Sequence, residues 1–358
     1  MHDLAKIATI QAIEPIPGKD RIVLATVENY KSIVKKDEFK EGDRVIYVFY
    51  DAILPPRPEF EFLRTRCWSE KYQGFRIKPI KMGGVISEGL VVSTSLLGAK
   101  GDSLPVGTVV TKELGIRAYD PDAAAVKIEP RRAWWMRCKP LARLLRKLGF
   151  GKPKKAKGYP ALIPKADEEN IEKLWDSIRM RTDEFVITEK MEGSAAMYSL
   201  DRKGRLHCYS HNWEVGNSGI WGTVAKDREI RKALLTLRKA KGKDWAIEGE
   251  ICGPGIQKNI YHFSGYRLFL YAAYQLSDGR RASWKELKEI SAITGLETVP
   301  FIRKGPILPS LDEMLKDCEG KSCLPGCGDV PREGLVWRTE DGSLHFKCKS
   351  RPYKVWFA

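Results

Sequence analysis

The chain has 358 residues, 43% of them hydrophobic, and a formal net charge of +16. No apolar run reaches the roughly 18 residues of a transmembrane helix, and the N-terminus lacks a signal-peptide pattern, so a cytoplasmic protein without a membrane partner is expected. The basic balance suits nucleic acid, because bound phosphates release their counterions. No obligate protein partner is inferred.

Residues 1–116 are expected to form an all-β domain. Short runs rich in Val and Ile occur at 5–13, 20–27, 44–49 and 84–94, with Gly and Pro turn signals between them. This spacing predicts a small barrel. We interpret it as OB-like, since the face and loops of an OB barrel bind single strands. An unspecialised β-domain is the alternative.

Residues 117–158 form a basic linker. From position 131 to 157 there are eleven Lys and Arg residues and no acid, with tryptophans and leucines at roughly helical spacing. A basic amphipathic helix with a Lys/Gly/Pro tail is expected. It suits nucleic acid, which we favour, or an anionic membrane surface. A solvated connector between domains is the plain alternative.

Residues 159–358 are expected to form an α+β domain with antiparallel sheets. Apolar residues at 3–4 spacing predict a helix over 167–181, and further helices are expected at 225–239 and 283–295. The rest is dominated by predicted strands, at 185–188, 195–200, 206–210, 245–251, 268–275, 335–339 and 343–349.

A lysine stands where the strand at 185–188 runs into a turn. Lys190 is followed by Glu192 and Gly193, and a second strand begins after them. To attack a phosphorus atom the lysine must lose its proton, and burial with a nearby cation lowers the pKa for that purpose. Gly193 lets the backbone approach a ligand closely. A short Lys-x-Glu-Gly string is by itself most often an ordinary turn.

Two later strands add groups of the same chemistry. Glu248 and Glu250 share one face of the strand at 245–251, where a carboxylate is costly without a partner such as a metal or a sugar hydroxyl. Phe269 and Tyr271 share one face of the next strand, and an aromatic there can stack on a purine, although core packing is commoner.

The C-terminal segment reads as a hairpin with charged residues on both strands. Glu333 precedes the first strand, 340–342 forms the turn, and Lys347 and Lys349 alternate onto one face of the second strand. Two lysines on one face can hold a phosphate, and Glu333 can help hold a divalent cation. The alternative is an exposed edge decorated with lysine.

The cysteines are scattered singly, which favours reduced thiols. Cys318, Cys323 and Cys327 lie close together in a Gly/Pro-rich stretch, with Cys348 as the nearest further ligand. Because no paired Cys-x-x-Cys spacing is present, we consider a zinc site the weaker interpretation.

Together and in this order, these elements resemble the covalent nucleotidyltransferase superfamily of ligases and capping enzymes. The residues that carry the resemblance are Lys190-Met-Glu-Gly193 for the Lys-x-Asp/Glu-Gly motif, Glu250 for the central strand glutamate, Phe269 for the base-stacking aromatic, Glu333-Gly334, and the pair Lys347 and Lys349. The string at 87–91 repeats Glu-Gly-Leu-Val, but it precedes the nucleophile and has no lysine hairpin, so we assign Glu88 to the barrel.

The order of domains narrows the resemblance. The β-rich region lies before the lysine motif and only nine residues follow Lys349, which resembles RNA ligase family 5, the nick-sealing RNA ligases with an N-terminal OB domain. This implies use of ATP with Mg²⁺ or Mn²⁺, a lysyl-AMP at Lys190, transfer of AMP to a 5′-phosphate, and attack by a 3′-OH of RNA. The resemblance further implies that Glu192, Glu250 and Glu333 hold the metal, Phe269 stacks on adenine, Lys347 and Lys349 contact the α-phosphate, and Gly193 and Asn212 belong to the nucleotide site.

Two positions depart from that family. His211 stands where the Ser/Gly-Arg-Asn motif has arginine, and Asn170 stands where an arginine orients pyrophosphate. Histidine holds ribose or phosphate more weakly than a guanidinium, so slow adenylation is expected unless Lys165 or Arg338 substitutes. A GTP-dependent capping-type guanylyltransferase and a non-catalytic nucleic-acid-binding protein on a decayed ligase fold are the alternatives.

Overall fold

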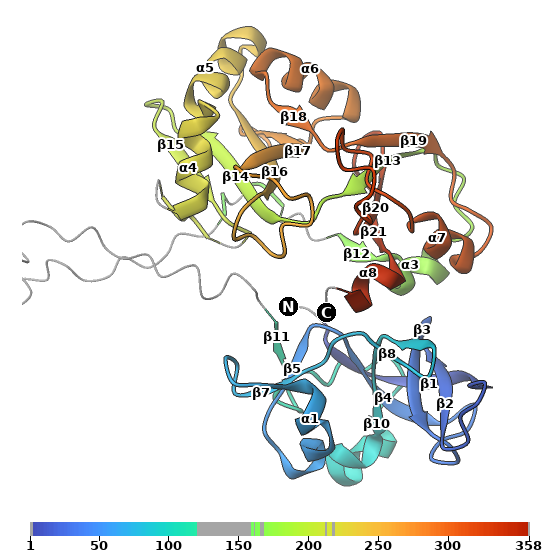
Figure 1. The fold of residues 1–358 in the computed structure, drawn as a ribbon. Coiled ribbons are helices and arrows are strands. Elements are labelled where there is room, and N and C mark those ends of the chain that lie inside the picture. Colours follow the sequence, from blue (N-terminus) through green and yellow to red (C-terminus); the bar gives the residue numbers. More distant parts are fainter. Residues whose placement is uncertain are drawn as a thin grey trace, which may run out of the picture.

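The computed structural model describes residues 3–119, 159–160, 162–164, 168–211, 213–216 and 219–356. Figure 1 shows an N-terminal β-domain, blue to cyan, below a larger α+β domain, green to red. The α+β character and the barrel in front of it are both confirmed. No helix in the described part of the chain is long and apolar enough to span a membrane.

The N-terminal barrel is built on one antiparallel sheet in the order β10-β4-β1-β2-β3. Its strands are β1 (Ala5–Pro15), β2 (Ile22–Val27), β3 (Tyr30–Lys35), β4 (Arg44–Phe49) and β10 (Gly89–Ser93). The sheet curls until its edges meet, because the N–H of Glu88, just before β10, donates to the carbonyl of Lys31 on β3 at 2.8 Å.

A second group of short elements covers one end of this barrel. A four-stranded sheet has the order β11-β5-β7-β6, and β8 pairs with β9. Phe60 and Phe75 fill the core between them and the barrel. The elements are β5 (Ala52–Leu54), η1 (Pro58–Leu63), α1 (Arg64–Cys67), β6 (Trp68–Ser69), β7 (Gly74–Arg76), β8 (Ile80–Met82), β9 (Val85–Ser87), η2 (Thr94–Ser103) and β11 (Arg117–Ala118).

The first sheet of the larger domain has the order β12-β21-β20-β13-β19. Helices α3 and α7 pack on one side of it, against the apolar side chains that alternate along the strands. The elements are β12 (Glu169–Asn170), α3 (Ile171–Ile178), β13 (Phe185–Lys190), β19 (Phe301–Gly305), α7 (Leu311–Asp317), β20 (Gly334–Thr339) and β21 (His345–Lys349).

The second sheet of this domain has the order β15-β14-β16-β17-β18. Three helices cover its outer side and form the largest apolar core (Figure 1). The elements are β14 (Ser194–Leu200), β15 (Leu206–Tyr209), α4 (Gly219–Asp227), α5 (Ile230–Lys241), β16 (Trp245–Cys252), β17 (Arg267–Gln275), α6 (Trp284–Thr294) and β18 (Glu297–Thr298).

A short helix, α8 (Arg351–Trp356), lies where the two domains meet (Figure 1). Lys354 on this helix is 2.7 Å from Glu88 of the barrel and 2.7 Å from Glu172 of α3. The side chains of all three residues are at most 2% exposed. The domains are therefore joined through a buried ion cluster as well as through the chain.

Several predicted details differ from the structure. The sheets are mixed, because β12 pairs parallel with β21 and β17 pairs parallel with β18. The helix expected over 167–181 is α3 alone, since 169–170 are extended and pair with β21. The helix expected over 225–239 is two helices, broken where Glu229 has a φ of 47°. The predicted basic helix at 131–157 lies outside the described residues.

Candidate functional site

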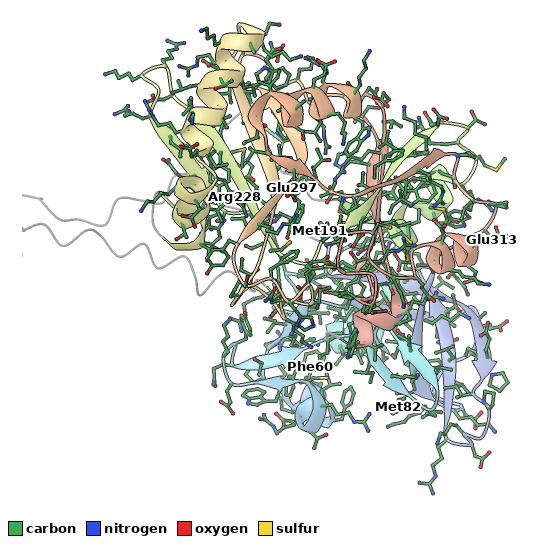
Figure 2. All side chains as sticks on the ribbon, turned by 45° about the horizontal axis from the view of Figure 1, so that its top comes forward. Phe60, Met82, Met191, Arg228, Glu297 and Glu313 are labelled. Carbon is green, nitrogen blue, oxygen red and sulfur yellow. The ribbon has the colours of Figure 1, made fainter. Side chains whose placement is uncertain are left out.

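One face of the β13-β20-β21 ladder carries the predicted phosphate-binding residues. Lys190 pairs with Gly334, which pairs with Lys349, and Thr188 pairs with Val336, which pairs with Lys347. The alternate residues, including Leu335 and Trp337, point into the core under α3 and α7. Met191, which follows Lys190, is labelled in Figure 2. Alternation predicted a common face for Lys347 and Lys349, and the register of β13 with β20 adds Lys190 to the same surface.

Lys190 is held in an ion pair. Its Nζ lies 2.8 Å from Glu333 Oε1, and Lys349 Nζ lies 3.5 Å from the same oxygen. Burial alone lowers the pKa of Lys190, but the charges of Glu333 and Glu250 outweigh burial, and the pKa stands above its ordinary value. The same cations hold the pKa of buried Glu333 below its ordinary value despite desolvation. Without a bound cation, Lys190 is therefore an ammonium, not a nucleophile.

Glu192 and Gly193 are placed by the loop after β16. Glu192 accepts hydrogen bonds from the N–H groups of Lys258, at 2.9 Å, and Ile260, at 3.4 Å. A Cβ on Gly193 would lie 2.6 Å from Glu250 Cγ and 2.4 Å from the carbonyl of Ile251. Glycine is needed here for close approach to β16, and the predicted approach to a ligand stays a prediction. The carboxylate of Glu192, in contrast, already accepts hydrogen bonds from this loop.

The two candidate aromatics on β17 differ in exposure. Phe269 is fully buried and its ring packs near Phe263 and under Arg267. The ladder between β16 and β17 is irregular at Glu248 and Gly249, which pair with Ala272 and Leu270 and leave Tyr271 as an extra residue. Such a bulge re-aims a side chain. Tyr271 is half-buried, with the Arg338 guanidinium 5.7 Å from its ring centroid.

Further buried polar residues lie two pairs along β20 from Gly334. Arg338 forms a 2.7 Å ion pair with Glu168, which holds the pKa of that carboxyl near 2 against the effect of burial. Glu248 is 1% exposed and accepts a hydrogen bond from the Tyr159 hydroxyl at 3.0 Å. Burial raises the pKa of Glu248 to about 7. Four residues of strand span about 13 Å, so Arg338 stands well away from the phosphate end of the site.

The structure describes Asn170 and His211, the two positions that depart from the family pattern. Asn170 lies on β12 beside Lys347, with a buried Oδ1 that has no hydrogen-bond partner among the described residues. His211 is half-buried at the end of β15. Asn212 and Lys165 lie outside the described residues. Arg338, one of the two proposed substitutes for the missing arginine, already forms an ion pair with Glu168.

No metal centre is assembled from protein side chains in the described ranges. They contain no group of three His, Cys, Asp or Glu residues that could hold an ion, so Glu192, Glu250 and Glu333 do not form a three-ligand site by themselves. The cysteines considered for a zinc site lie in different surroundings. Cys318 and Cys348 are buried in the core under α7, and Cys323 is exposed.

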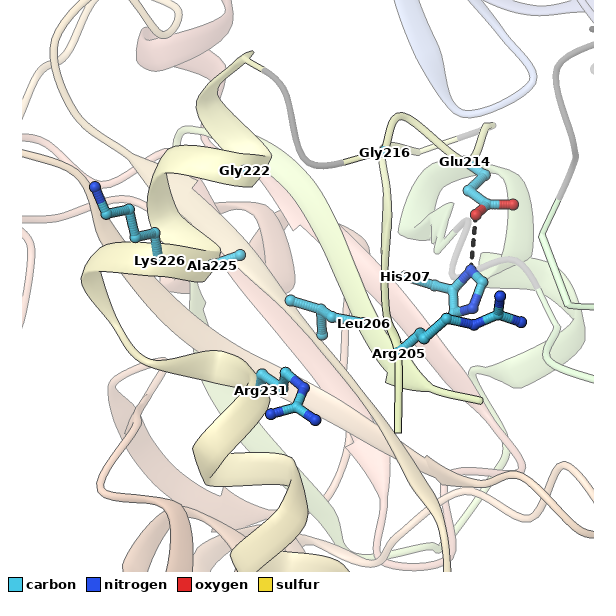
Figure 3. A pocket seen from close by; sticks show the side chains of 9 residues that line it. All are labelled: Arg205, Leu206, His207, Glu214, Gly216, Gly222, Ala225, Lys226 and Arg231. Carbon is cyan, nitrogen blue, oxygen red and sulfur yellow. Dashed lines mark hydrogen bonds and ion pairs between the residues drawn. The ribbon is translucent and has the colours of Figure 1, made fainter. Parts of the chain in front are cut away.

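A cavity of about 820 Å³ opens between β15 and the helices α4 and α5. Figure 3 shows Arg205 and the hydrogen-bonded His207 and Glu214 on one side and Lys226 and Arg231 on the other. None of the predicted site residues lines it. We call this cavity the basic groove.

Sequence reasoning did not assign Tyr271, Glu168 and Glu248 to the site. Alternation along β17 predicts the same face for Phe269 and Tyr271. It cannot reveal a bulge, because the bulge depends on how β17 pairs with β16. A signal did exist for Glu248, since an acid in an apolar strand calls for a partner. Glu168 had none, because its partner Arg338 is 170 positions away.

Comparison with known proteins finds a match for each of the two domains. Residues 183–356 match the profile of the RNA ligase family, and residues 4–94 match an OB-fold domain. No curated protein is similar enough to count as a relative.

The solved structures that resemble the chain include several of one enzyme, the RNA ligase of Naegleria gruberi. An aspartate-to-alanine variant without ligand is 23% identical, with a TM-score of 0.81 over 98% of this chain and 97% of that chain. The enzyme with pyrophosphate and a lysine-to-methionine variant with AMP and manganese match at TM-scores of 0.80 and 0.81, each at 23% identity over 99% and 98% of the chains. This likeness extends the shared fold to both domains. Residues 183–356 are therefore similar to the RNA ligase family, and residues 4–94 in front of them are similar to an OB-fold domain.

Proposed function

We propose that this protein is an ATP-dependent RNA ligase that reacts through a lysyl-AMP at Lys190 and seals a 3′-OH RNA end to a 5′-phosphate end at nicks in duplexes. The observation that carries the proposal is the common face of Lys190, Lys347 and Lys349, with Glu333 at 2.8 Å from the nucleophile. The complexes of the Naegleria gruberi ligase with AMP, manganese and pyrophosphate support it.

In the first step the Nζ of Lys190 forms a bond to the α-phosphorus of ATP, and the bond from that phosphorus to the bridging oxygen breaks. Pyrophosphate leaves with the electron pair of that bond. Lys190 must first release a proton, and a cation bound at Glu333 would favour this by breaking the 2.8 Å ion pair that holds the ammonium form. Lys347 and Lys349 stabilise the negative charge that develops on the α-phosphate.

A divalent cation, Mg²⁺ or Mn²⁺, fits this site in a restricted way. Mg²⁺ is commonly held by one or two carboxylates together with substrate phosphates, and Glu250 and Glu333 both act on Lys190 electrostatically. These two residues would hold the cation, and Glu192 would keep its loop in place. When bound, the cation supplies positive charge that favours a neutral lysine and a polarised α-phosphate.

The adenine base would lie between the two sheets. Val336 is one pair along β20 from the phosphate end, and Tyr271 presents its ring beside Arg338. Stacking between an aliphatic side chain and an aromatic ring suits a flat base. We thus assign to Tyr271 the stacking role that the family resemblance implied for Phe269, whose ring is fully buried.

The nucleic-acid partner would be bound by basic surfaces outside the nucleotide site. Arg205 and Lys226 line the basic groove, and the residues at 131–157 add further positive charge. Both are suited to phosphates of a duplex and not to a particular base.

The test is the mass of the protein after incubation with ATP or GTP and Mg²⁺ or Mn²⁺. A gain of one AMP that Lys190→Ala abolishes is the expected result, followed by sealing of nicked duplexes whose 3′-OH strand is RNA. An adduct with GTP alone would favour a guanylyltransferase. Binding of nucleic acid without any adduct would favour a decayed ligase fold.

A further inference from the structure

The far end of the nucleotide site, around Tyr271, contains buried polar atoms without partners. Glu248 Oε1 accepts the Tyr159 hydroxyl, but Oε2 has no hydrogen-bond partner in the part of the chain that the structure describes. Burial raises the pKa of this carboxyl most strongly, and a side-chain hydrogen bond from Tyr274 is among the smaller effects that lower it. Arg338 is 8% exposed, and its Nε is unpartnered within the same ranges. Leaving such atoms unpaired costs about 1–3 kcal/mol each, so a ligand that pairs with them is favoured.

These atoms border one place. Tyr271 is the extra residue opposite Glu248 and Gly249 on β16, so its ring lies next to Glu248 in the ladder. Arg338 approaches the same ring from the other sheet, 5.7 Å from its centroid. Along β16, Glu250 acts on Lys190 and Glu248 lies two residues farther from it, just as Arg338 lies farther along β20 than Gly334. Both sheets thus run in the same order from phosphate to base.

When the six-position of a purine is turned toward Glu248 in its carboxylate form, the unpartnered atoms complement adenine and not guanine. Glu248 Oε2 can accept a hydrogen bond, and Arg338 Nε–H can only donate one. Adenine presents its exocyclic N6 amine as a donor next to an acceptor ring nitrogen, whereas guanine presents an acceptor oxygen at the same place. A guanine oxygen facing Glu248 would leave two acceptors opposed.

We propose that Glu248 is a specificity-determining residue that accepts a hydrogen bond from the exocyclic amine of adenine, with Arg338 donating to a neighbouring ring nitrogen. This rests on the proposed use of a nucleotide at Lys190. Glu248 selects the nucleotide, and Lys190 carries out the chemistry. In this arrangement the ion pair between Arg338 and Glu168 fixes the orientation of the donor.

The experiment removes the proposed hydrogen bond either from the protein, by changing Glu248, or from the nucleotide, by omitting the exocyclic amine. The rate of Lys190 adduct formation is measured as kcat/KM with ATP and with purine riboside triphosphate, which lacks the amine, for the full-length protein, Glu248→Ala and Glu248→Gln. For Glu248→Ala we expect a fall of about tenfold to hundredfold with ATP, the range for a hydrogen bond to a charged group. With purine riboside triphosphate we expect a change below about threefold. Glu248→Gln keeps a carbonyl acceptor and should restore most of the ATP rate.

The outcomes separate the possibilities. Equal losses with both nucleotides would show that Glu248 only supports the fold and would overturn the proposal. Tyr159→Phe removes the bond to Oε1 and leaves Oε2, so its preference for ATP over the analogue should stay unchanged; a lost preference would also count against Glu248 as the reader. If the unchanged protein forms no adduct with any nucleotide, the proposed function fails first, and that result is distinct from equal losses.

Discussion

Lys354 of the ligase domain and Glu88 of the barrel form an ion pair at 2.7 Å whose side chains are 2% and 1% exposed. The second partner of Lys354, Glu172, is equally close and fully buried. Glu88 stands in the string that repeats the Glu-Gly-Leu-Val of the catalytic hairpin. Both glutamates of the repeated string thus bind a lysine, one between the domains and the other, Glu333, at the nucleophile.

Removing the charge of Lys354 alone should destabilise the protein strongly. Lys354→Met leaves Glu172 buried without the cation that pairs with it and leaves Glu88 with only the 3.6 Å contact to Arg351. Breaking a buried pair typically costs about 3–5 kcal/mol, so the thermal midpoint should fall by about 10 °C. Adding Glu88→Gln and Glu172→Gln should recover most of that loss. Lys232→Met, which breaks an exposed ion pair with Glu229, is the control and should shift the midpoint by less than about 2 °C. Equal shifts for Lys354→Met and its control would contradict the buried cluster.

Tyr271 should matter for ATP and Phe269 for stability. Tyr271→Leu removes a ring worth about 1–3 kcal/mol in stacking on a base, so the KM for ATP in adduct formation should rise by about tenfold to hundredfold. Tyr271→Phe should behave like the unchanged protein. Phe269→Leu should lower the thermal midpoint with little effect on that KM, because its ring is buried. The reverse pattern would return the stacking role to Phe269.

Gly193 should not tolerate a side chain. An added Cβ would lie 2.4 Å from the carbonyl of Ile251 and 2.6 Å from Glu250 Cγ, and relieving such contacts costs about 1–3 kcal/mol. Gly193→Ala should therefore slow adduct formation about tenfold or more. Gly265→Ala is the matched control, since nothing lies within 4 Å of its Cβ position. Similar rates for the two variants would show that the loop gives way freely.

Glu168 and Arg338 should show a pH dependence. The pKa of Glu168 is lowered from 4.5 to about 2, so its contribution to stability is complete above its ordinary value and is lost as the pH falls toward 2. Glu168→Gln leaves Arg338 buried and unpaired, at a cost of about 3–5 kcal/mol at pH 7. Denaturant unfolding at several pH values should show the two proteins converging below pH 4.5. A constant difference down to pH 3 would contradict the assignment.

The basic groove should contribute to the salt dependence of nucleic-acid binding. Arg205→Gln and Lys226→Gln should each reduce the slope of log affinity against log salt by about one if each contacts a phosphate. Lys232→Gln serves as the control, because Lys232 lies on α5 outside the groove lining. Fluorescence anisotropy with a nicked RNA duplex measures the slope, and unchanged slopes for the groove variants would remove the groove from the binding surface.

Local alternation and motif order were enough to predict much of the site. Lys347 and Lys349 share one face as expected, because a period of two is fixed by strand geometry. Lys190 joins them through the register of β13 with β20, which alternation alone could not predict. Alternation could not distinguish Tyr271 from Phe269, since the bulge depends on how β16 and β17 pair. Nor could it show that Glu192 is held by the amides of Lys258 and Ile260, a contact 66 to 68 positions away.

The arrangement of the first sheet has a consequence for synthesis on the ribosome. The strand that carries Lys190 lies between β19 and β20, and β21 separates β20 from β12, so three of its five strands are translated more than a hundred residues after β13. At typical elongation speeds that delay is roughly 10–30 s. The barrel can fold during this interval, while β13, with Phe185 and Ile187, still lacks the strand β20 with which it pairs. Newly made chains thus pass through a stage with a finished first domain and an open apolar strand, where a chaperone that shields β13 would be of most use.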